Sequence, residues 1–313
     1  MNSFSLAFSV VFPLFLMMAL GYFLRRVGLF NDGFLKQLND LCFKVFLSTL
    51  LFVNIYDSDF SASFQPKLLA FALLSITAVF LAFMVIVPRF EKSNLRRGVV
   101  VQGIFRSNYI LFGLPIAISL CGDANVGSTA ILIAFVVPLL NLLSVIALEY
   151  FIGEKINYKK ILVGVVTNPL IIGSVLALVF VFLKIKLPNI IIETARDVAT
   201  IATPLSLIVL GGSFTFSKLK PNAKGLFFTV LGKLFVMPLC ILTVAILLGF
   251  RGVELGALLA MSASPTAVSS FTMAQEVGAD DEYAAQIVVV ASLFSIVSIF
   301  LWITILSQMG FLV

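Results

Sequence analysis

The sequence has no histidine and few charged side chains, which make up only 12% of its 313 residues. The absence of histidine excludes His-based acid–base catalysis, HExxH zinc sites and haem ligation through histidine. Three cysteines, Cys42, Cys121 and Cys240, lie in apolar runs at no metal-ligand spacing, and an odd number cannot form a complete disulfide framework. No GxxxxGK motif followed by Ser or Thr is present, which excludes a P-loop nucleotide-binding site. We therefore expect no cofactor, no bound metal and no enzymatic activity.

Apolar side chains dominate instead. They make up 61% of the sequence, and the mean hydropathy is +1.14, far above the range of a soluble globular domain. Runs of about twenty apolar residues favour membrane helices over a barrel, whose strands alternate over about ten residues. We therefore predict an all-α integral membrane protein with ten spans, near residues 5–24, 36–56, 67–88, 96–121, 126–150, 160–183, 192–215, 223–249, 254–277 and 283–309.

Lysine and arginine are unevenly distributed over the loops between these spans. With both termini outside, thirteen of them, including Arg25, Arg26 and Lys224, fall on the cytoplasmic side, and five fall on the other. This positive-inside bias predicts an N-out, C-out topology, in what we expect to be a bacterial inner (plasma) membrane. The net charge of +6 then faces anionic lipid, and we expect no nucleic-acid partner.

Ten spans divide into two sets of five, and an odd number of spans in each half makes the second half enter from the opposite side. In such a 5+5 inverted repeat, residues 1–153 would form the first five-helix repeat and residues 154–313 the second. The sequence gives weak support at a nearly constant offset, because Ser48 corresponds to Pro204 and Ser107 to Pro265.

Two spans contain polar, proline-bearing stretches about ten residues from either end. The fourth has "IFRSNYILFGLPIA", and the ninth has "SASPTAVSS" around Pro265. Proline removes a backbone donor and opens a helix, and irregular backbone at this depth is tolerated only inside protein or beside a wet cavity. We predict broken crossover helices, with non-helical backbone around 106–109 and 263–266 lying close together, whose half-helix ends suit an anion. The alternative is a simple kink, since proline kinks are common in membrane helices.

Three basic residues lie within the spans. Lys44 is expected to pair with Asp40 four residues earlier. Arg106 and Lys233 lie deeper, where a charge costs about 2.5–3.5 kcal/mol, and no acid is found at their depth. An anionic ligand explains both charges; the alternatives are burial of Arg106 against carbonyls and a snorkelling Lys233. Asn141 is an intramembrane amide that serves either helix contact or ligand contact.

The acidic run "EVGADDEYAAQ" contains Asp280 and Asp281. Paired aspartates occur in prenyl-transferring enzymes, but this chain has a single cluster, placed in a tight turn between the last two spans. We interpret it as a loop with a helix N-cap.

These features resemble the auxin efflux carrier family, whose prokaryotic members are often called malonate or organic-acid transporters. The resemblance covers the whole chain and is carried by "SNYILFGLPI", by "LEYF" with Glu149 and Tyr150, and by "ASPTAVSSFTMAQEVG". Ser107 stands where plant members have proline, which puts the first crossover in doubt. Asn108 corresponds to the family's substrate-contacting asparagine.

The resemblance implies a scaffold of spans 1, 2, 6 and 7, often dimeric, and a mobile transport unit of spans 3–5 and 8–10 that moves as an elevator. We expect a secondary transporter of a small organic anion, a malonate-, malate- or auxin-like mono- or dicarboxylate, working by alternating access as a homodimer in the lipid bilayer, with H⁺ or Na⁺ open as coupling ion. The candidate substrate-binding residues are Arg106, Ser107, Asn108, Tyr109, Asn141, Lys233, Ser264, Pro265 and Thr266.

Ser264 and Thr266 are expected to face the substrate from the side opposite Asn108. A sodium-coupled symporter resembling the bile-acid carriers remains an alternative, as do an anion channel and an intramembrane enzyme, although no nucleophile or metal set is visible for the last.

Overall fold

A computed structural model describes residues 3–57, 65–121, 127–152, 158–215 and 219–312. Within these ranges the chain is helical and contains no strand, which confirms the all-α class. The first half contains α1 (Ser3–Arg26), α2 (Asp32–Leu41), the π-helical turn η1 (Cys42–Leu47), α3 (Ser48–Tyr56), α4 (Pro66–Ile86), the 3-10 turn η2 (Val87–Arg89), α5 (Asn94–Phe105), the π-helical turn η3 (Tyr109–Gly113), α6 (Leu114–Cys121) and α7 (Gly127–Phe151).

The second half begins with a helix pair in place of one long helix. It contains α8 (Tyr158–Val166), α9 (Pro169–Phe182), α10 (Asn189–Ser213), α11 (Leu219–Leu231), the π-helical turn η6 (Gly232–Val236), α12 (Met237–Leu247), α13 (Gly252–Ala263), α14 (Ser269–Val277) and α15 (Asp281–Gln308).

Seven helical stretches of the described chain are long and apolar enough to cross a membrane. They are Asp32–Tyr56, Pro66–Arg89, Asn94–Cys121, Ser128–Phe151, Asn189–Ser213, Leu219–Leu247 and Asp281–Gln308. Pro169–Phe182 and Gly252–Ala263 are shorter apolar helices. The protein is therefore an integral membrane protein, while the ten-span inverted repeat stays a prediction.

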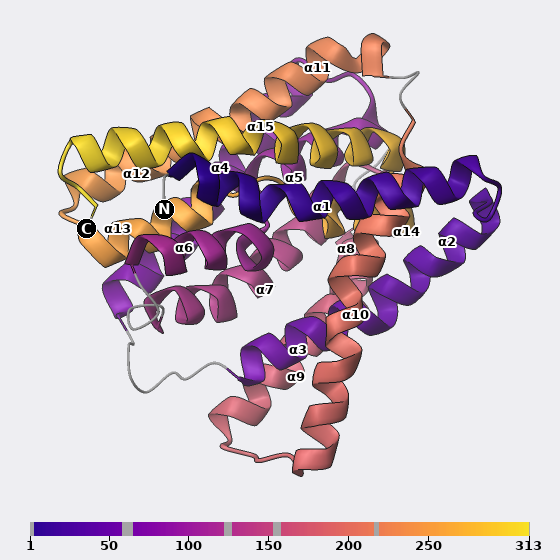
Figure 1. Ribbon diagram of the computed structural model, residues 1–313, viewed down its shortest axis with the longest axis horizontal. Coiled ribbons are helices and arrows are strands. Elements are labelled where there is room, and N and C mark those ends of the chain that lie inside the picture. Colours follow the sequence, from indigo (N-terminus) through magenta and orange to yellow (C-terminus); the bar gives the residue numbers. More distant parts are fainter. Residues whose placement is uncertain (1–2, 58–64, 122–126, 153–157, 216–218, 313) are drawn as a thin grey trace.

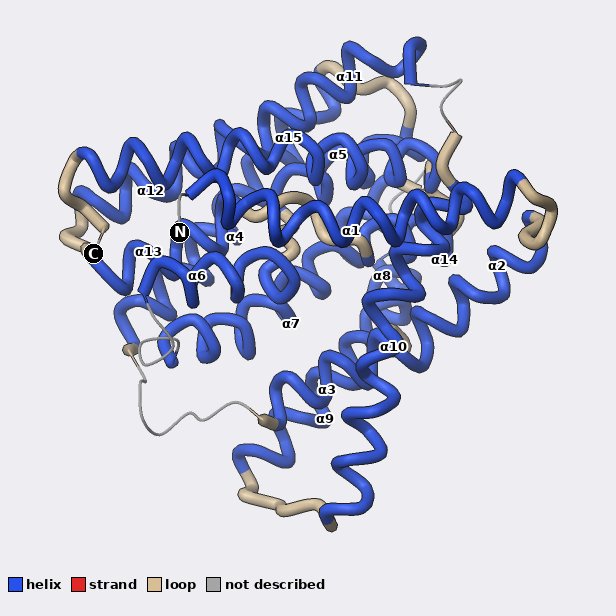
Figure 2. The backbone as a smooth tube through the Cα atoms, in the orientation of Figure 1, coloured by secondary structure: helices blue, strands red, loops and turns tan. Residues whose placement is uncertain are grey.

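The long helices α1 and α15 pack side by side and run in opposite directions, so α1 begins where α15 ends (Figure 1). The helices α3, α9 and α10 pack together and form the lower part of the molecule in the same view. Figure 2 shows loop segments in the middle of the molecule, surrounded by helices. These interior loops are the interruptions of the fourth and ninth predicted spans.

Short polar residues set several helix boundaries. Asn31 caps α2 by accepting from Phe34 N at 2.8 Å, and Asn168 caps α9, where Pro169 takes the first helical position. That position suits proline because its missing N–H has no partner in the helix. Asn168 therefore serves as the helix cap that starts α9.

Glycines allow α1 and α10 to approach closely. A Cβ at Gly21 would collide with the backbone oxygen of Ile208, and one at Gly211 would collide with that of Met18. Small residues at such crossings let membrane helices pack by direct backbone contact. These two helices, predicted as parts of the scaffold, therefore form one tightly packed pair.

Proline by itself does not break these helices. Pro13, Pro138 and Pro204 all lie inside continuous helices, in α1, α7 and α10. Pro265, in contrast, lies in a non-helical segment between α13 and α14. The helix therefore continues through the first three prolines, and something beyond proline keeps the ninth predicted span open.

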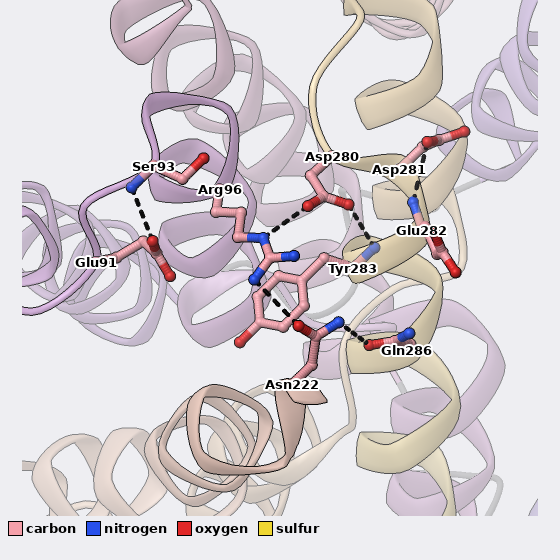
Figure 3. A network of polar contacts seen from close by, with 9 residues as sticks. All are labelled: Glu91, Ser93, Arg96, Asn222, Asp280, Asp281, Glu282, Tyr283 and Gln286. Carbon is pink, nitrogen blue, oxygen red and sulfur yellow. Dashed lines mark hydrogen bonds and ion pairs between the residues drawn. The ribbon is translucent and has the colours of Figure 1, made fainter. Parts of the chain in front are cut away.

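The acidic turn before α15 belongs to a polar network (Figure 3). Asp280 accepts from Tyr283 N at 2.9 Å and caps α15, which confirms the expected N-cap. Its other oxygen lies 2.7 Å from Arg96 Nε, and Arg96 also donates to Asn222 Oδ1 at 3.1 Å and stacks over the Tyr283 ring. Asn222 donates in turn to Gln286 at 2.8 Å. The network ties α5 and α11 to the start of α15.

Replacing Asp280 with alanine removes the cap of α15 and the ion-pair partner of Arg96 together. We expect the free energy of unfolding to fall by about 1–2 kcal/mol, measured as a Tm a few degrees lower in detergent. Glu193→Ala is the matched control, because it removes an exposed carboxylate that pairs with Arg196 within one helix. Equal melting of the two variants would contradict the role given to Asp280.

Candidate functional site

The first interruption begins at Arg106. The helix α5 ends at Phe105, and Arg106 adopts extended backbone angles of φ −79° and ψ 128°. Asn108 then caps the next helical turn by accepting from Leu111 N at 3.4 Å. The predicted break is confirmed over 106–108, although Ser107 stands where plant members have proline and Tyr109 is already helical.

The second interruption begins at Ser264, whose φ of −59° and ψ of 140° end α13. The chain becomes helical again in α14 from Ser269. Hydroxyl groups bond to carbonyls of the preceding turn: Ser262 Oγ donates to Leu258 O at 2.8 Å and Ser264 Oγ to Ala260 O at 2.5 Å. These serines therefore keep their polar groups satisfied inside the protein.

The two interruptions are bonded to one another. Asn108 N donates to Pro265 O at 2.8 Å, and Thr266 Oγ1 donates to Gly103 O at 2.7 Å. The prediction that the two segments lie close together is thus confirmed. The buried amide of Gln102 adds a bond to Ser270 O at 3.0 Å, which is the helix contact expected of such an amide.

Arg106 is 2% exposed and lies between the two interruptions and α7. Its guanidinium donates to Asn141 Oδ1 at 2.6 Å, to Ser269 Oγ at 2.8 Å and to the sulfur of Met273. No carboxylate of the described chain forms an ion pair with it. The positive charge is thus held by neutral acceptors.

Lys233 is fully buried in the turn η6, so the snorkelling alternative is wrong. Its ammonium donates to Ser107 Oγ at 2.5 Å, and Lys233 itself does not line the cavity described next. Lys44 pairs with Asp40 at 4.0 Å, as expected, and it also forms a closer salt bridge, at 3.1 Å, with Glu276 on α14, which was not predicted.

A cavity of about 70 Å³ lies beside the first interruption. Helices α3, α7, α9 and α10 and residues Ala267–Ser269 enclose the rest of it. The described residues around it include no Asp or Glu. The polar residues that line it are Arg106, Ser107, Asn108, Tyr109, Asn141, Thr203, Ser206 and Ser269.

Five of the nine predicted site residues line the cavity. Three further polar residues that we did not predict also line it, namely Thr203, Ser206 and Ser269. Lys233, Ser264, Pro265 and Thr266 lie outside its lining. Thr266, expected to face the substrate, is fully buried and donates to Gly103 O in the last turn of α5, just before the first interruption. The added residues Thr203 and Ser206 flank Pro204, which the sequence pairs with Ser48, but nothing in the sequence placed them beside Arg106.

Two amide groups in the cavity wall have donors without acceptors. Asn108 Nδ2 and Asn141 Nδ2 are buried and have no hydrogen-bond partner among the described residues. The oxygens of both amides are occupied, by Leu111 N and by Arg106, which fixes the orientation of each amide. An unpaired buried donor costs about 1–3 kcal/mol, so the cavity is suited to a group that accepts hydrogen bonds.

An apolar helical protein in which two interrupted membrane helices meet beside a buried polar cavity has the design of a membrane transport protein. The chain belongs to the family described as membrane transport protein, which matches residues 6–303 and is the auxin efflux carrier family that the sequence resembles. The resemblance is therefore confirmed.

Curated relatives cover nearly the whole chain. An uncharacterized transporter of Methanocaldococcus jannaschii, MJ1031, is 22% identical over 94% of this chain and 96% of its own length. The uncharacterized transporter YfdV of Escherichia coli strain K12 is 24% identical over 93% of this chain and 95% of its own length. These relatives support a transport function and name no substrate.

Thr266→Val keeps the side-chain shape but removes the hydroxyl that donates to Gly103 O. We expect the free energy of unfolding to fall by about 1–2 kcal/mol, the cost of leaving a buried acceptor unpaired, seen as a lower Tm in detergent. Thr194→Val is the control, because that hydroxyl donates to Ile190 O within its own helix at an exposed position. A Thr266 variant as stable as the control would return Thr266 to the list of substrate contacts.

Proposed function

We propose that this membrane transport protein is a secondary transporter of a small organic anion, a mono- or dicarboxylate, that binds in the cavity beside Arg106. The observation that supports this most is the pairing of a buried guanidinium with two amide donors that lack acceptors, in a cavity wall without Asp or Glu. A carboxylate supplies the missing negative charge and the missing acceptors together.

The contacts suggest how each group would act on a carboxylate. Asn108 and Asn141 would each donate from Nδ2, and the guanidinium held by Asn141 Oδ1 would neutralise the charge. Hydrogen bonds between ionised partners are about twice as strong as neutral ones. Because the interior is apolar, the attraction is screened much less than at a surface.

The size of the cavity favours a short substrate. A volume of about 70 Å³ accommodates a few water molecules or a short carboxylate such as malonate. A steroid-sized anion would need a much larger opening, which disfavours the alternative that resembles the bile-acid carriers.

The elements around the cavity fit alternating access. Leu47 and Leu50 on the second predicted span, Leu170 on the sixth and Thr203 on the seventh form one wall. The interruptions and α7, in the predicted transport unit, form the other. We propose that the wall from spans 2, 6 and 7 is the static scaffold and that the crossover unit moves past it as an elevator. The salt bridge of Lys44 to Glu276 would join the two parts on the cytoplasmic side.

The same proposal includes the ten-span inverted repeat, N-out and C-out, in a bacterial inner membrane, with the scaffold forming a homodimer. Counterflow in proteoliposomes tests the transport mechanism, because internal unlabelled substrate accelerates the uptake of labelled substrate only through a carrier. An anion channel would show electrogenic flux without such acceleration. A panel of short carboxylates, assayed with and without pH and sodium gradients, identifies the substrate and the coupling ion.

Arg106→Gln removes the positive charge while keeping an amide in its place. We expect the apparent KM for the transported carboxylate to rise at least about tenfold, because one charge-assisted hydrogen bond is lost. Initial counterflow rates over a range of substrate concentrations measure this. Arg251→Gln is the control, because Arg251 lies away from the cavity and donates to backbone carbonyls. Unchanged KM in a well-inserted Arg106 variant would exclude an anion site there.

Asn108→Ala removes one of the unpaired donors without leaving a new charge buried. A carboxylate at about 100 times its Kd should stabilise the parent protein by roughly 2.7 kcal/mol through mass action. We expect the Tm increase in malonate to be smaller for Asn108→Ala and for Asn141→Ala than for the parent. Ser75→Ala, on the fourth helix outside the cavity, should keep the full increase. Identical increases in all four proteins would place the carboxylate elsewhere.

A further inference from the structure

Lys233 contacts the first helix interruption and the last turn of α13, which leads directly into the second interruption. Its Nζ donates to Ser107 Oγ in the first at 2.5 Å and to the backbone oxygen of Ser262, one residue before α13 ends, at 3.4 Å. The third partner is the sulfur of Met237, at 3.4 Å one turn along its own helix. A protonated lysine has three donors and no acceptor, so three acceptors match the ammonium form.

The position of these acceptors is electrically negative. Ser262 lies in the last turn of α13, where carbonyl groups lack partners within the helix and the helix dipole has its negative end. No Asp or Glu of the described chain pairs with Lys233. Backbone carbonyls at the ends of half-helices, with nearby hydroxyl oxygens, are the groups that hold a coupling sodium ion in transporters with broken helices.

The lysine is delivered to this place by local backbone geometry. The turn η6 is π-helical, a rare form that often occurs at functional sites. Trp302 of α15 donates its ring N–H to Leu234 O at 2.9 Å, and so fixes the turn against the last helix. The ammonium is thus positioned by its own π-helical turn and by the contact of that turn with α15.

From these contacts we infer that the Lys233 ammonium is a tethered cation that occupies the place of a coupling sodium ion between the two interruptions. The carrier therefore binds no sodium there and transports its substrate without sodium. This inference rests on the proposed transport function. Ser107 joins the two sites, because it accepts from Lys233 and also lines the cavity of Arg106. Lys233 is accordingly a positioning residue that acts on the substrate anion through Ser107.

The first test needs no variant. Counterflow of malonate, succinate and pyruvate is measured in proteoliposomes that contain either sodium chloride or choline chloride at equal concentration. The expected result is equal uptake in the two salts. Sodium activation of about tenfold, the equivalent of 1.4 kcal/mol of coupling, would overturn the inference while supporting the transport function. No counterflow of any carboxylate in either salt would count against the transport function alone.

The second test is independent of the substrate and uses thermal melting in detergent. The parent should have the same Tm in sodium chloride and in choline chloride, because its cation place is filled. Lys233→Ala empties the place, so its lowered Tm should rise again with sodium or with propylammonium and stay low with choline, which is too large. Lys44→Ala is the matched control, since its salt bridge is at the surface, and it should respond equally to all the cations.

Two outcomes of the melting test would contradict the inference. One is a parent Tm that rises specifically with sodium, which would show that sodium still binds. The other is a Lys233→Ala Tm that responds equally to all three cations, which would make the lysine a packing residue. Lys233→Met controls for the loss of side-chain volume, because it retains the apolar stem and removes only the charge. It should melt below the parent.

Discussion

The structure depends on one constraint, which is that backbone groups freed inside an apolar bundle must find partners there. The two interrupted helices meet this constraint together, since the amide of Asn108 donates to the carbonyl of Pro265 and the hydroxyl of Thr266 donates to the carbonyl of Gly103. Each interruption thus provides a hydrogen-bond partner for a backbone group that is left free at the other. Because an unpaired group at this depth costs several kcal/mol, neither break is expected to persist without the other.

The same crossing determines where charge can be buried. Arg106 and Lys233 are both held by neutral acceptors, and each donates to one of the two helix ends that flank the second interruption, Arg106 to Ser269 in α14 and Lys233 to Ser262 in α13. The two cations have distinct environments. Arg106 lines a cavity whose wall holds two unpaired amide donors, whereas the acceptors around Lys233 are matched to its own donors. This difference is why we propose a ligand beside the arginine and a built-in ion at the lysine.

Some of the site could be predicted residue by residue, and some could not. The hydroxyl-rich stretch around Pro265 indicated the second break because proline lacks a donor, and Asn108 was indicated by the family resemblance. Thr266 and Ser264, predicted as substrate contacts, bond to backbone carbonyls and lie outside the cavity lining, a difference that a sequence does not reveal. Asp40 was correctly predicted as a partner of Lys44 because it is near in sequence, whereas the closer partner Glu276 was missed because it is near only in the folded chain.

The sequence alone determined the all-helical membrane class of the protein and the second interruption. These follow from hydropathy, from the absence of histidine and from proline chemistry, which act over one turn or one span. The tertiary structure decided which polar groups meet. It opened the first break without a proline, turned Lys233 toward Ser107 and left the amides of Asn108 and Asn141 facing a cavity. Those outcomes depend on contacts between segments more than thirty residues apart, and local sequence patterns carry no information about such contacts.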